Sequence, residues 1–350
     1  MIVTGRSLSH RASGVLLPLA RTAFALAFLV VLAGSVVRMT GSGMGCPDWP
    51  RCFGLMIPPT HASEVTWTEG ESYTAGRMIV AQDTLWVAQE EVEAFHFPSE
   101  RSQGMWLPYT QHDYAVFNPV HTWVEFINRL LGALAGIPAL LLLVASALAR
   151  DLRATLISLL GVIALGAVAW LGKLVVDGNL IPHSITLHML GAVAILAIDS
   201  VLIQGFRGQT VRWYRTPRWA LLLATFLTLG QIVTGTEVRE LVDVLLHEGT
   251  LRSALMSGLE LSQEFVVHRS GIWVLMAAHV FWMWRMGPFG PRHVIVARNI
   301  LVFLLLGQLV TGLLFVYGEF PAWAQPLHLV IALAMFTTSW GLWWRTTAQG

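Results

Sequence analysis

Eight long apolar segments set the fold class of this chain. They lie at about 16–38, 122–148, 154–176, 184–205, 218–236, 263–284, 297–317 and 325–344. Each can span the hydrocarbon core of a bilayer, which takes about 20 residues, and only 12% of all residues are charged. Because lipid offers no partners to backbone N–H and C=O groups, spanning segments of this kind fold as helices. The sequence therefore predicts an all-α membrane protein with eight transmembrane helices.

Arginines and carboxylates occupy alternate connections between these segments. The basic positions are Arg6, Arg11, Arg150, Arg153, Arg207, Arg212, Arg215, Arg218, Arg285, Arg292, Arg298 and Arg345. The acidic positions include Glu90, Glu91, Glu93, Glu240, Asp243 and Glu248. The positive-inside rule then places both termini in the cytoplasm and the loop at about 40–121 outside. The net charge of +1 gives no indication of nucleic-acid binding, because topology accounts for the basic residues.

A short phrase recurs near the ends of the odd-numbered segments. It reads LGKLVVDG at 171–178, LGQIVTG at 229–235, LGQLVTG at 306–312 and, more weakly, AGSVVRMTG at 33–41. Repeats in membrane proteins usually place the functional site at or within the repeat unit. We therefore predict two pseudo-symmetric four-helix halves, at 16–205 and 218–344. We expect the long loop of the first half to form a partly helical cap.

Four polar residues lie just inside the ends of apolar segments, in two matched pairs. His188 follows Asn128 by 60 residues, and His328 follows His268 by the same interval. An imidazole in hydrocarbon needs a partner, and two imidazoles from neighbouring helices suit the two axial faces of an iron porphyrin. We therefore predict that His268 and His328 clamp one haem iron; packing histidines near an interface are the alternative. Arg269 could pair with a haem propionate or be an ordinary interfacial arginine.

The first half has Asn128 where the second half has an imidazole. Asparagine is a poor iron ligand, so this half should hold a porphyrin through one axial bond, from His188, or through no permanent axial bond. An open iron position suits a substrate better than an electron relay. Glu125 lies three residues before Asn128, on the same helix face. Its carboxylate could act as a base or stabilise a developing cation, or it could simply pair with Arg129.

Two cysteines, Cys46 and Cys52, flank the sequence PDWPR in the first long loop, and the chain has no others. In an oxidising outer compartment they can form a disulfide. A structural disulfide that closes the loop and a redox-active one with a raised potential both stay open. His279, eleven residues after His268, is expected to be a buried hydrogen-bonded residue rather than a third ligand.

At these residues the chain resembles the haem A synthase family. The strongest likeness is GSVVRMTGSGMGCPDWPRCFG at 34–54, with its glycine-rich helix end followed by Cys-Pro-Asp-Trp-Pro. Next come WVEFINRLLGALAG at 123–136, LGKLVVDGNLIPHSITLHMLGA at 171–192 and LGQLVTGLLFVYGEFPAWAQPLHLVIALAMF at 306–336. The likeness extends over all eight segments.

The resemblance implies an enzyme that oxidises the C8 methyl group of haem O to a formyl group, giving haem A. It implies a haem b between His268 and His328, a haem O substrate site at His188, and a catalytic Glu125. From their positions beside Glu125 we also assign Asn128 and Arg129 to the substrate site. The family's cysteine pair corresponds to Cys46 and Cys52, and we assign Arg269 to the cofactor site because it follows His268 directly. The implied partners are a haem O synthase and a haem-copper oxidase in the inner (plasma) membrane of the cell. A homo-oligomer stays open.

The chain departs from the family pattern at Asn128, where many members have histidine. An alternative from another class is a bis-haem membrane electron carrier, akin to quinol-oxidising cytochromes and without hydroxylase activity. That function would need two axial ligands at each of two haems, and Asn128 argues against it. A small-molecule transporter ranks last, because it would need a polar site at the membrane midplane.

Overall fold

The computed structural model of this protein describes residues 13–93, 104–110, 117–177, 183–208, 211–212, 218–288 and 290–347. Eight of the described helices are long and apolar enough to cross a membrane, which confirms the predicted all-α membrane fold. They are α1 (Ser13–Thr40), α2 (Pro119–Leu148), α3 (Leu152–Asp177), α4 (Ser184–Arg207), α5 (Arg218–His247), α7 (Gln263–Met286), α8 (Arg292–Tyr317) and α9 (Ala324–Arg345). Three arginines used to predict the orientation, Arg6, Arg11 and Arg215, lie outside the described residues.

Helix α5 continues to His247, well past the predicted end at 236. The added turns are amphipathic. Val238 is buried in a cluster with the short helix α6 (Leu255–Leu259), while Arg239 and Asp243 form an i, i+4 ion pair. Hydropathy falls where the charges begin, so a prediction from hydropathy ends the helix too early.

Capping residues fix where two of the site-bearing helices begin. Before α2, the Asn118 Oδ1 atom accepts hydrogen bonds from the N–H groups of Val120, at 3.0 Å, and His121, at 3.3 Å. Before α7, the Ser262 Oγ atom accepts one from the Phe265 N–H at 3.2 Å. Such caps satisfy the free N–H groups of a first turn and thereby set the register of the residues that follow.

The chain divides into two compact units. The larger comprises Met1–Leu32, Gly132–Ala169 and Pro182–Gly350, and the smaller comprises Ala33–Leu131 and Trp170–Ile181. The predicted halves at 16–205 and 218–344 divide the chain differently and stay a prediction.

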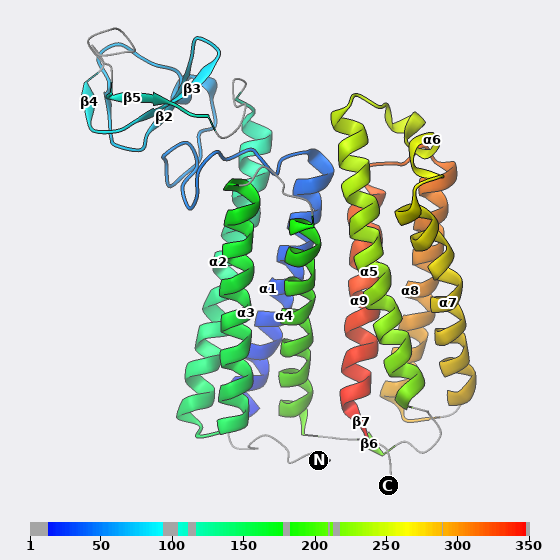
Figure 1. The fold of residues 1–350 in the computed structure, drawn as a ribbon. Helices are drawn as coiled ribbons and strands as arrows, with labels where there is room; N and C mark the ends of the chain where they lie inside the picture. The colour runs from blue at the N-terminus through cyan, green and yellow to red at the C-terminus, as the bar shows by residue number, and fades with distance from the viewer. Residues whose placement is uncertain are drawn as a thin grey trace. The chain divides into compact units, whose positions relative to one another are not determined.

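In the larger unit α9 packs against α4, α5 and α8, and α5 also packs against α7 (Figure 1). A cluster of buried side chains that includes Leu196, Ile232 and Leu333 joins α4, α5 and α9. The indole N–H of Trp340 in α9 donates a 3.0 Å hydrogen bond to the carbonyl oxygen of Ala197 in α4. Hydrogen bonds between side chains and backbone of neighbouring helices help to hold helices together in an apolar environment. This bond therefore fixes the position of α9 along α4.

The smaller unit contains the long loop, which folds mainly as short strands. Its elements are η1 (Ala62–Val65), β1 (Ser72–Tyr73), β2 (Met78–Ala81), β3 (Thr84–Ala88), β4 (Val92–Glu93) and β5 (Trp106–Pro108). Strands β2, β3 and β5 form an antiparallel sheet and β1 pairs with β4 (Figure 1). Gln82 and Asp83, with φ of 52° and 55°, make the two-residue β2–β3 turn, as type I′ geometry requires. The expectation of a partly helical cap is therefore wrong.

The remaining described elements are the turn η3 (Arg252–Ala254) and one short parallel pair of strands. That pair, β6 (Val211–Arg212) with β7 (Thr346–Thr347), brings the chain after α4 beside the end of α9.

Candidate functional site

Two histidines face each other in the larger unit. His268 lies in the second turn of α7 and His328 in the second turn of α9. Their ring centroids are 6.2 Å apart, with ring planes inclined at 67°. Phe315 packs edge-on against His328, with centroids 5.3 Å apart. The structure thus brings these two imidazoles together, and their binding of a haem iron stays a prediction.

Each imidazole contacts a threonine through the same ring nitrogen. The Thr234 Oγ1 atom lies 3.0 Å from Nδ1 of His268, and the Thr311 Oγ1 atom lies 2.7 Å from Nδ1 of His328. In addition, the amide group of Gln308 donates a 2.8 Å hydrogen bond to the backbone carbonyl of His328. Because the Nδ1 atoms are engaged in this way, the Nε2 atoms are the ones left to bind a metal.

The spacing of the rings suits a shared iron atom. A bond from an imidazole nitrogen to a metal is about 2 Å long, so two rings on opposite sides of one ion have centroids roughly 6 Å apart. The observed 6.2 Å agrees with that distance. The donor set, two neutral aromatic nitrogens in an apolar environment, is the one that a low-spin haem iron takes.

A carboxylate in the smaller unit is held by the disulfide loop. Glu125 in α2 is buried, with 4% of its surface exposed. Its Oε2 atom accepts a 2.8 Å hydrogen bond from the backbone N–H of Cys46, and its Oε1 atom forms an ion pair with Arg129. Cys46 and Cys52 are joined by a disulfide. Both carboxylate oxygens are thereby fixed in one orientation.

Arg129 binds the backbone of the same loop. Its guanidinium group donates to the carbonyl oxygens of Asp48 at 2.6 Å, Arg51 at 3.1 Å and Cys46 at 3.3 Å. The fork geometry of arginine allows several acceptors to be bound at once. Arg129 therefore connects the PDWPR loop to the helix that carries Glu125.

Asp48, in the PDWPR loop, has a half-buried carboxyl group. The Asp48 Oδ2 atom accepts a 2.9 Å hydrogen bond from the N–H of Gly54. Burial raises the pKa of Asp48 above its ordinary value, although the Gly54 N–H and the nearby Arg129 oppose the shift. The carboxyl group is thus partly stabilised, but not enough to offset its removal from water.

Asn128 and His188 each carry an atom without a partner. The Oδ1 atom of Asn128 and the Nδ1 atom of His188 are buried, and neither has a hydrogen-bond partner among the described residues. Near Asn128, a Cβ atom added at Gly34 would lie 3.7 Å from the Asn128 Oδ1 atom. Asn128 belongs to the smaller unit and His188 to the larger.

The sequence matches a known family along most of its length. The family model COX15-CtaA, described as cytochrome oxidase assembly protein, matches residues 19–95 and 89–340. The chain belongs to this family. It is also similar to the heme A synthase of Shewanella oneidensis, with 24% identity over 223 residues, or 62% of this chain and 54% of the relative. The match thus spans about half the length of that curated relative.

Two further predicted residues take ordinary positions in this member of the COX15-CtaA family. Arg269 is exposed, and its guanidinium carbon lies 5.5 Å from the ring centroid of Phe265. His279 is fully buried, and its Nδ1 atom donates a 3.1 Å hydrogen bond to the carbonyl oxygen of Leu275. His279 is thus the buried hydrogen-bonded residue expected from the sequence.

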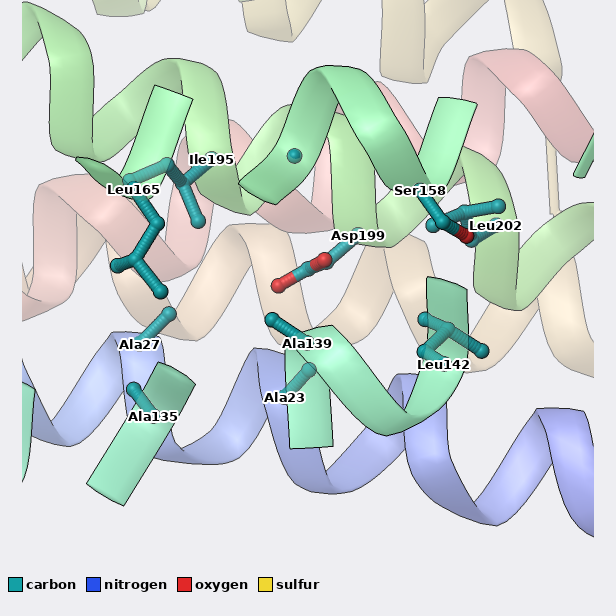
Figure 2. Close-up of a pocket in the computed structure, with 11 residues that line it drawn as sticks. Ala23, Ala27, Ala135, Ala139, Leu142, Ser158, Leu165, Ile195, Asp199 and Leu202 are labelled. Atoms are coloured by element: carbon teal, nitrogen blue, oxygen red, sulfur yellow. The ribbon is translucent and has the colours of Figure 1, made fainter. Parts of the chain in front are cut away.

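Four residues were not singled out from the sequence. They are Thr234 and Thr311, which contact the two histidines, and the carboxyl-bearing residues Asp48 and Asp199. The repeated phrase contains both threonines and was the available signal. Asp199 in α4, by contrast, carries no such pattern. It is 7% exposed and lines a small cavity of about 20 Å³ together with Ser158. Figure 2 shows its carboxyl group pointing toward Ala139.

Proposed function

We propose that this protein is a haem A synthase, an oxidoreductase that converts the C8 methyl group of haem O into a formyl group through a hydroxylated intermediate. The carrying observation is the facing pair His268 and His328, whose Nδ1 atoms are engaged and whose ring spacing suits one iron. The family match and the similarity to a heme A synthase support the same activity. His188, with Asn128 and Arg129, would form the haem O site.

The residues present fit a resident haem b. His268 and His328 would hold it through their Nε2 atoms, and Arg269 lies one residue from the first ligand. Bound there, the haem supplies a one-electron acceptor. The protein's part is to fix the ligand rings, surround them with apolar side chains such as Phe315, and exclude water, all of which tune the potential of an iron centre.

Glu125 is the proposed catalytic residue. Conversion of a methyl group and one water into a formyl group releases four electrons and four protons. Each of two rounds breaks a C–H bond and forms a bond to a water oxygen, and the resulting hydrate loses one water to leave the formyl group. The electrons leave one at a time and finally reach an external oxidant. Glu125 would take a proton or stabilise the positive charge that develops on the methyl carbon. Its fixed orientation, through the Cys46 N–H and Arg129, suits either role.

The proposed topology follows from the charge pattern. Both termini and the arginine-bearing connections face the cytoplasm, and the loop with Cys46 and Cys52 lies on the outer side of the inner (plasma) membrane. The halves at 16–205 and 218–344 would each hold one porphyrin. A haem O synthase would supply the substrate and a haem-copper oxidase would receive the product.

The deciding experiment is an analysis of the haems bound by the full-length protein. The protein is co-expressed with a haem O synthase and purified, and its extracted haems are separated by reversed-phase chromatography with mass detection. We expect haem b together with haem A or its hydroxylated precursor. Haem b alone, with haem O left unconverted in the membrane, would instead indicate the electron carrier.

Two ligand variants test the haem b site separately. We expect His268→Ala and His328→Ala each to lose the b-type absorption spectrum, because a single remaining imidazole holds the iron weakly. His279→Ala is the matched control, since His279 lies deeper in the same helix as His268 and is bonded to its own backbone. Retention of the wild-type spectrum in either ligand variant would contradict the assignment.

A further inference from the structure

We propose that Thr234 and Thr311 are positioning residues that hold His268 and His328 as Nε2 ligands of the haem iron; this inference rests on the proposed function. The two contacts are equivalent. Each threonine precedes the last glycine of the phrase LGQ-x-VTG, and each reaches the Nδ1 atom of one histidine on a neighbouring helix. Each copy of the phrase LGQ-x-VTG thus supplies the threonine that contacts one histidine.

The direction of these hydrogen bonds follows from the single proton that each threonine hydroxyl carries. A threonine hydroxyl has one proton, and the Thr311 hydroxyl donates it to the carbonyl oxygens of Gly307 at 2.8 Å and Gln308 at 3.2 Å. The Thr234 hydroxyl similarly donates to the Gln231 carbonyl at 3.3 Å. Each hydroxyl oxygen is therefore an acceptor toward its histidine, and Nδ1 carries the proton. Nε2 then presents its lone pair.

The glycine after Thr234 makes room for the ring of His268. A Cβ atom added at Gly235 would lie 3.0 Å from the Cε1 atom of His268, which is closer than side-chain contacts normally allow. At Gly312 the corresponding atom would lie 4.0 Å from Cε1 of His328, which is an ordinary van der Waals contact. At His268 the Thr-Gly pair therefore both binds and accommodates the imidazole.

The first half lacks this arrangement in its sequence. Counting from the glycine of LG, the threonine position is occupied by Arg38 in AGSVVRMTG and by Val176 in LGKLVVDG. The buried Nδ1 atom of His188 has no partner among the described residues. A ligand histidine whose second nitrogen is bonded is held in one tautomer and is more basic. The difference is what a permanent cofactor site and an exchangeable substrate site would require.

The test compares two substitutions of Thr311. Thr311→Val keeps the shape of the side chain and removes the hydroxyl group, whereas Thr311→Ser keeps the hydroxyl group. The same two substitutions are made at Thr234. Loss of the acceptor makes the imidazole less basic, so we expect the valine variants to have a higher haem b midpoint potential and about 10-fold weaker haem retention. The serine variants should resemble the wild type. Thr337→Val is the matched control, because Thr337 in α9 bonds only to its own helix.

The outcomes separate this inference from the proposed function. Wild-type potential and retention in the fully haem-loaded valine variants would overturn the inference while leaving the haem site intact. Absence of any b-type haem in the wild-type protein would instead overturn the proposed function. Electron paramagnetic resonance of the ferric protein gives a second readout, since it reports the axial ligand field and not protein stability.

A separate observation carries a second inference, at Asp199. We propose that the cavity beside Asp199 binds one water molecule between a protonated Asp199 carboxyl group and the Ser158 hydroxyl. Asp199 and Ser158 are 7% and 3% exposed. Among the described residues Asp199 has no hydrogen bond or ion pair, and the Ser158 Oγ atom is unpartnered. The other lining side chains are apolar, as Figure 2 shows for Ala23, Ala27 and Leu165.

The physical argument concerns charge and volume. A carboxylate without a cation is very unfavourable inside a bilayer, so the group keeps its proton. A cavity of about 20 Å³ is large enough for one water, and two polar groups lining it provide the partners that a buried water needs. Asp199 lies eleven residues after His188, which is about three helical turns along α4 on the same face. The site would thus be a proton-binding position further along the proposed substrate helix.

Infrared spectroscopy tests this site directly. We expect Asp199→Asn to remove one carbonyl-stretch band of a protonated carboxylic acid, and Ser158→Ala to shift that band. Ser146→Ala is the control, because Ser146 is equally buried and unpartnered but does not line this cavity. Wild-type and Asp199→Asn spectra without a difference in that region, or an unshifted band in Ser158→Ala, would overturn the inference.

Discussion

The backbone N–H of Cys46 donates a 2.8 Å hydrogen bond to the Oε2 atom of Glu125, although 79 positions separate the two residues in the sequence. The bond makes the disulfide loop and the buried carboxylate one structural element. A change in the path of the loop therefore alters the position of the carboxyl group, even where the residue changed is far from it.

Glu125→Gln should abolish conversion of haem O while leaving haem b bound. The glutamine side chain can still accept the Cys46 N–H, but it cannot take a proton or carry the charge that pairs with Arg129. Loss of a general base typically lowers a rate by 10²- to 10⁴-fold. Haem extraction from the variant measures both quantities, and full conversion at normal haem b content would exclude Glu125 as the catalytic residue.

Arg129→Lys should loosen the PDWPR loop. An ammonium group cannot bind three loop carbonyls and a carboxylate in the fixed fork geometry that arginine provides. Each lost hydrogen bond to a charged group contributes about 1.5–3 kcal/mol, so the Cys46–Cys52 disulfide should react faster with a mild reductant. Arg51→Lys is the control, because the Arg51 side chain is exposed. Equal reduction rates in both variants would contradict the proposed role.

Asp48→Asn should flatten the pH dependence of loop stability. Burial raises the pKa of Asp48 in the folded protein, so the folded state binds more protons than the unfolded state. Stability then falls as the pH rises from about 4 through the raised pKa. An asparagine oxygen can still accept the Gly54 N–H but does not titrate. Limited proteolysis of the full-length protein across this pH range checks the slope, and an unchanged slope would exclude Asp48 as its source.

Asn128→His should add an axial ligand to the proposed substrate haem. The Asn128 Oδ1 atom is buried without a partner among the described residues, and the neighbouring position on α1 is a glycine, Gly34. We expect a larger low-spin fraction of bound haem O, visible in the ferric absorption spectrum, together with slower turnover. A spectrum identical to the wild type would place Asn128 away from the iron.

The main features of the fold and the paired histidines could be predicted from the sequence for clear physical reasons. Spanning segments must be long, apolar and helical, so eight of them are visible in the composition alone. His268 and His328 stand out because imidazoles are rare in such segments. The equal 60-residue intervals in the two predicted halves stay a sequence pattern, because the LG phrases are offset differently from the histidines and the equality is partly chance.

Other features could not be predicted because their signals are local or depend on the tertiary fold. The two-residue turn at Gln82 and Asp83 lacks the glycine that usually marks such a hairpin, so the sheet of the long loop was missed. The threonine contacts depend on how helices pack, and a threonine in an apolar helix has many ordinary uses. Asp199 belongs to none of the repeated phrases or matched positions found in the sequence.

The Trp340–Ala197 hydrogen bond bears on how a flat, lipid-soluble molecule could reach the protein interior. It joins α9 to α4 at 3.0 Å, and Phe336, one turn from Trp340, stacks on the same indole with centroids 6.3 Å apart. Within the bilayer no water is present to replace a broken bond of this kind. A porphyrin that passes between α4 and α9 at this level would therefore have to break the Trp340–Ala197 hydrogen bond without water to replace it.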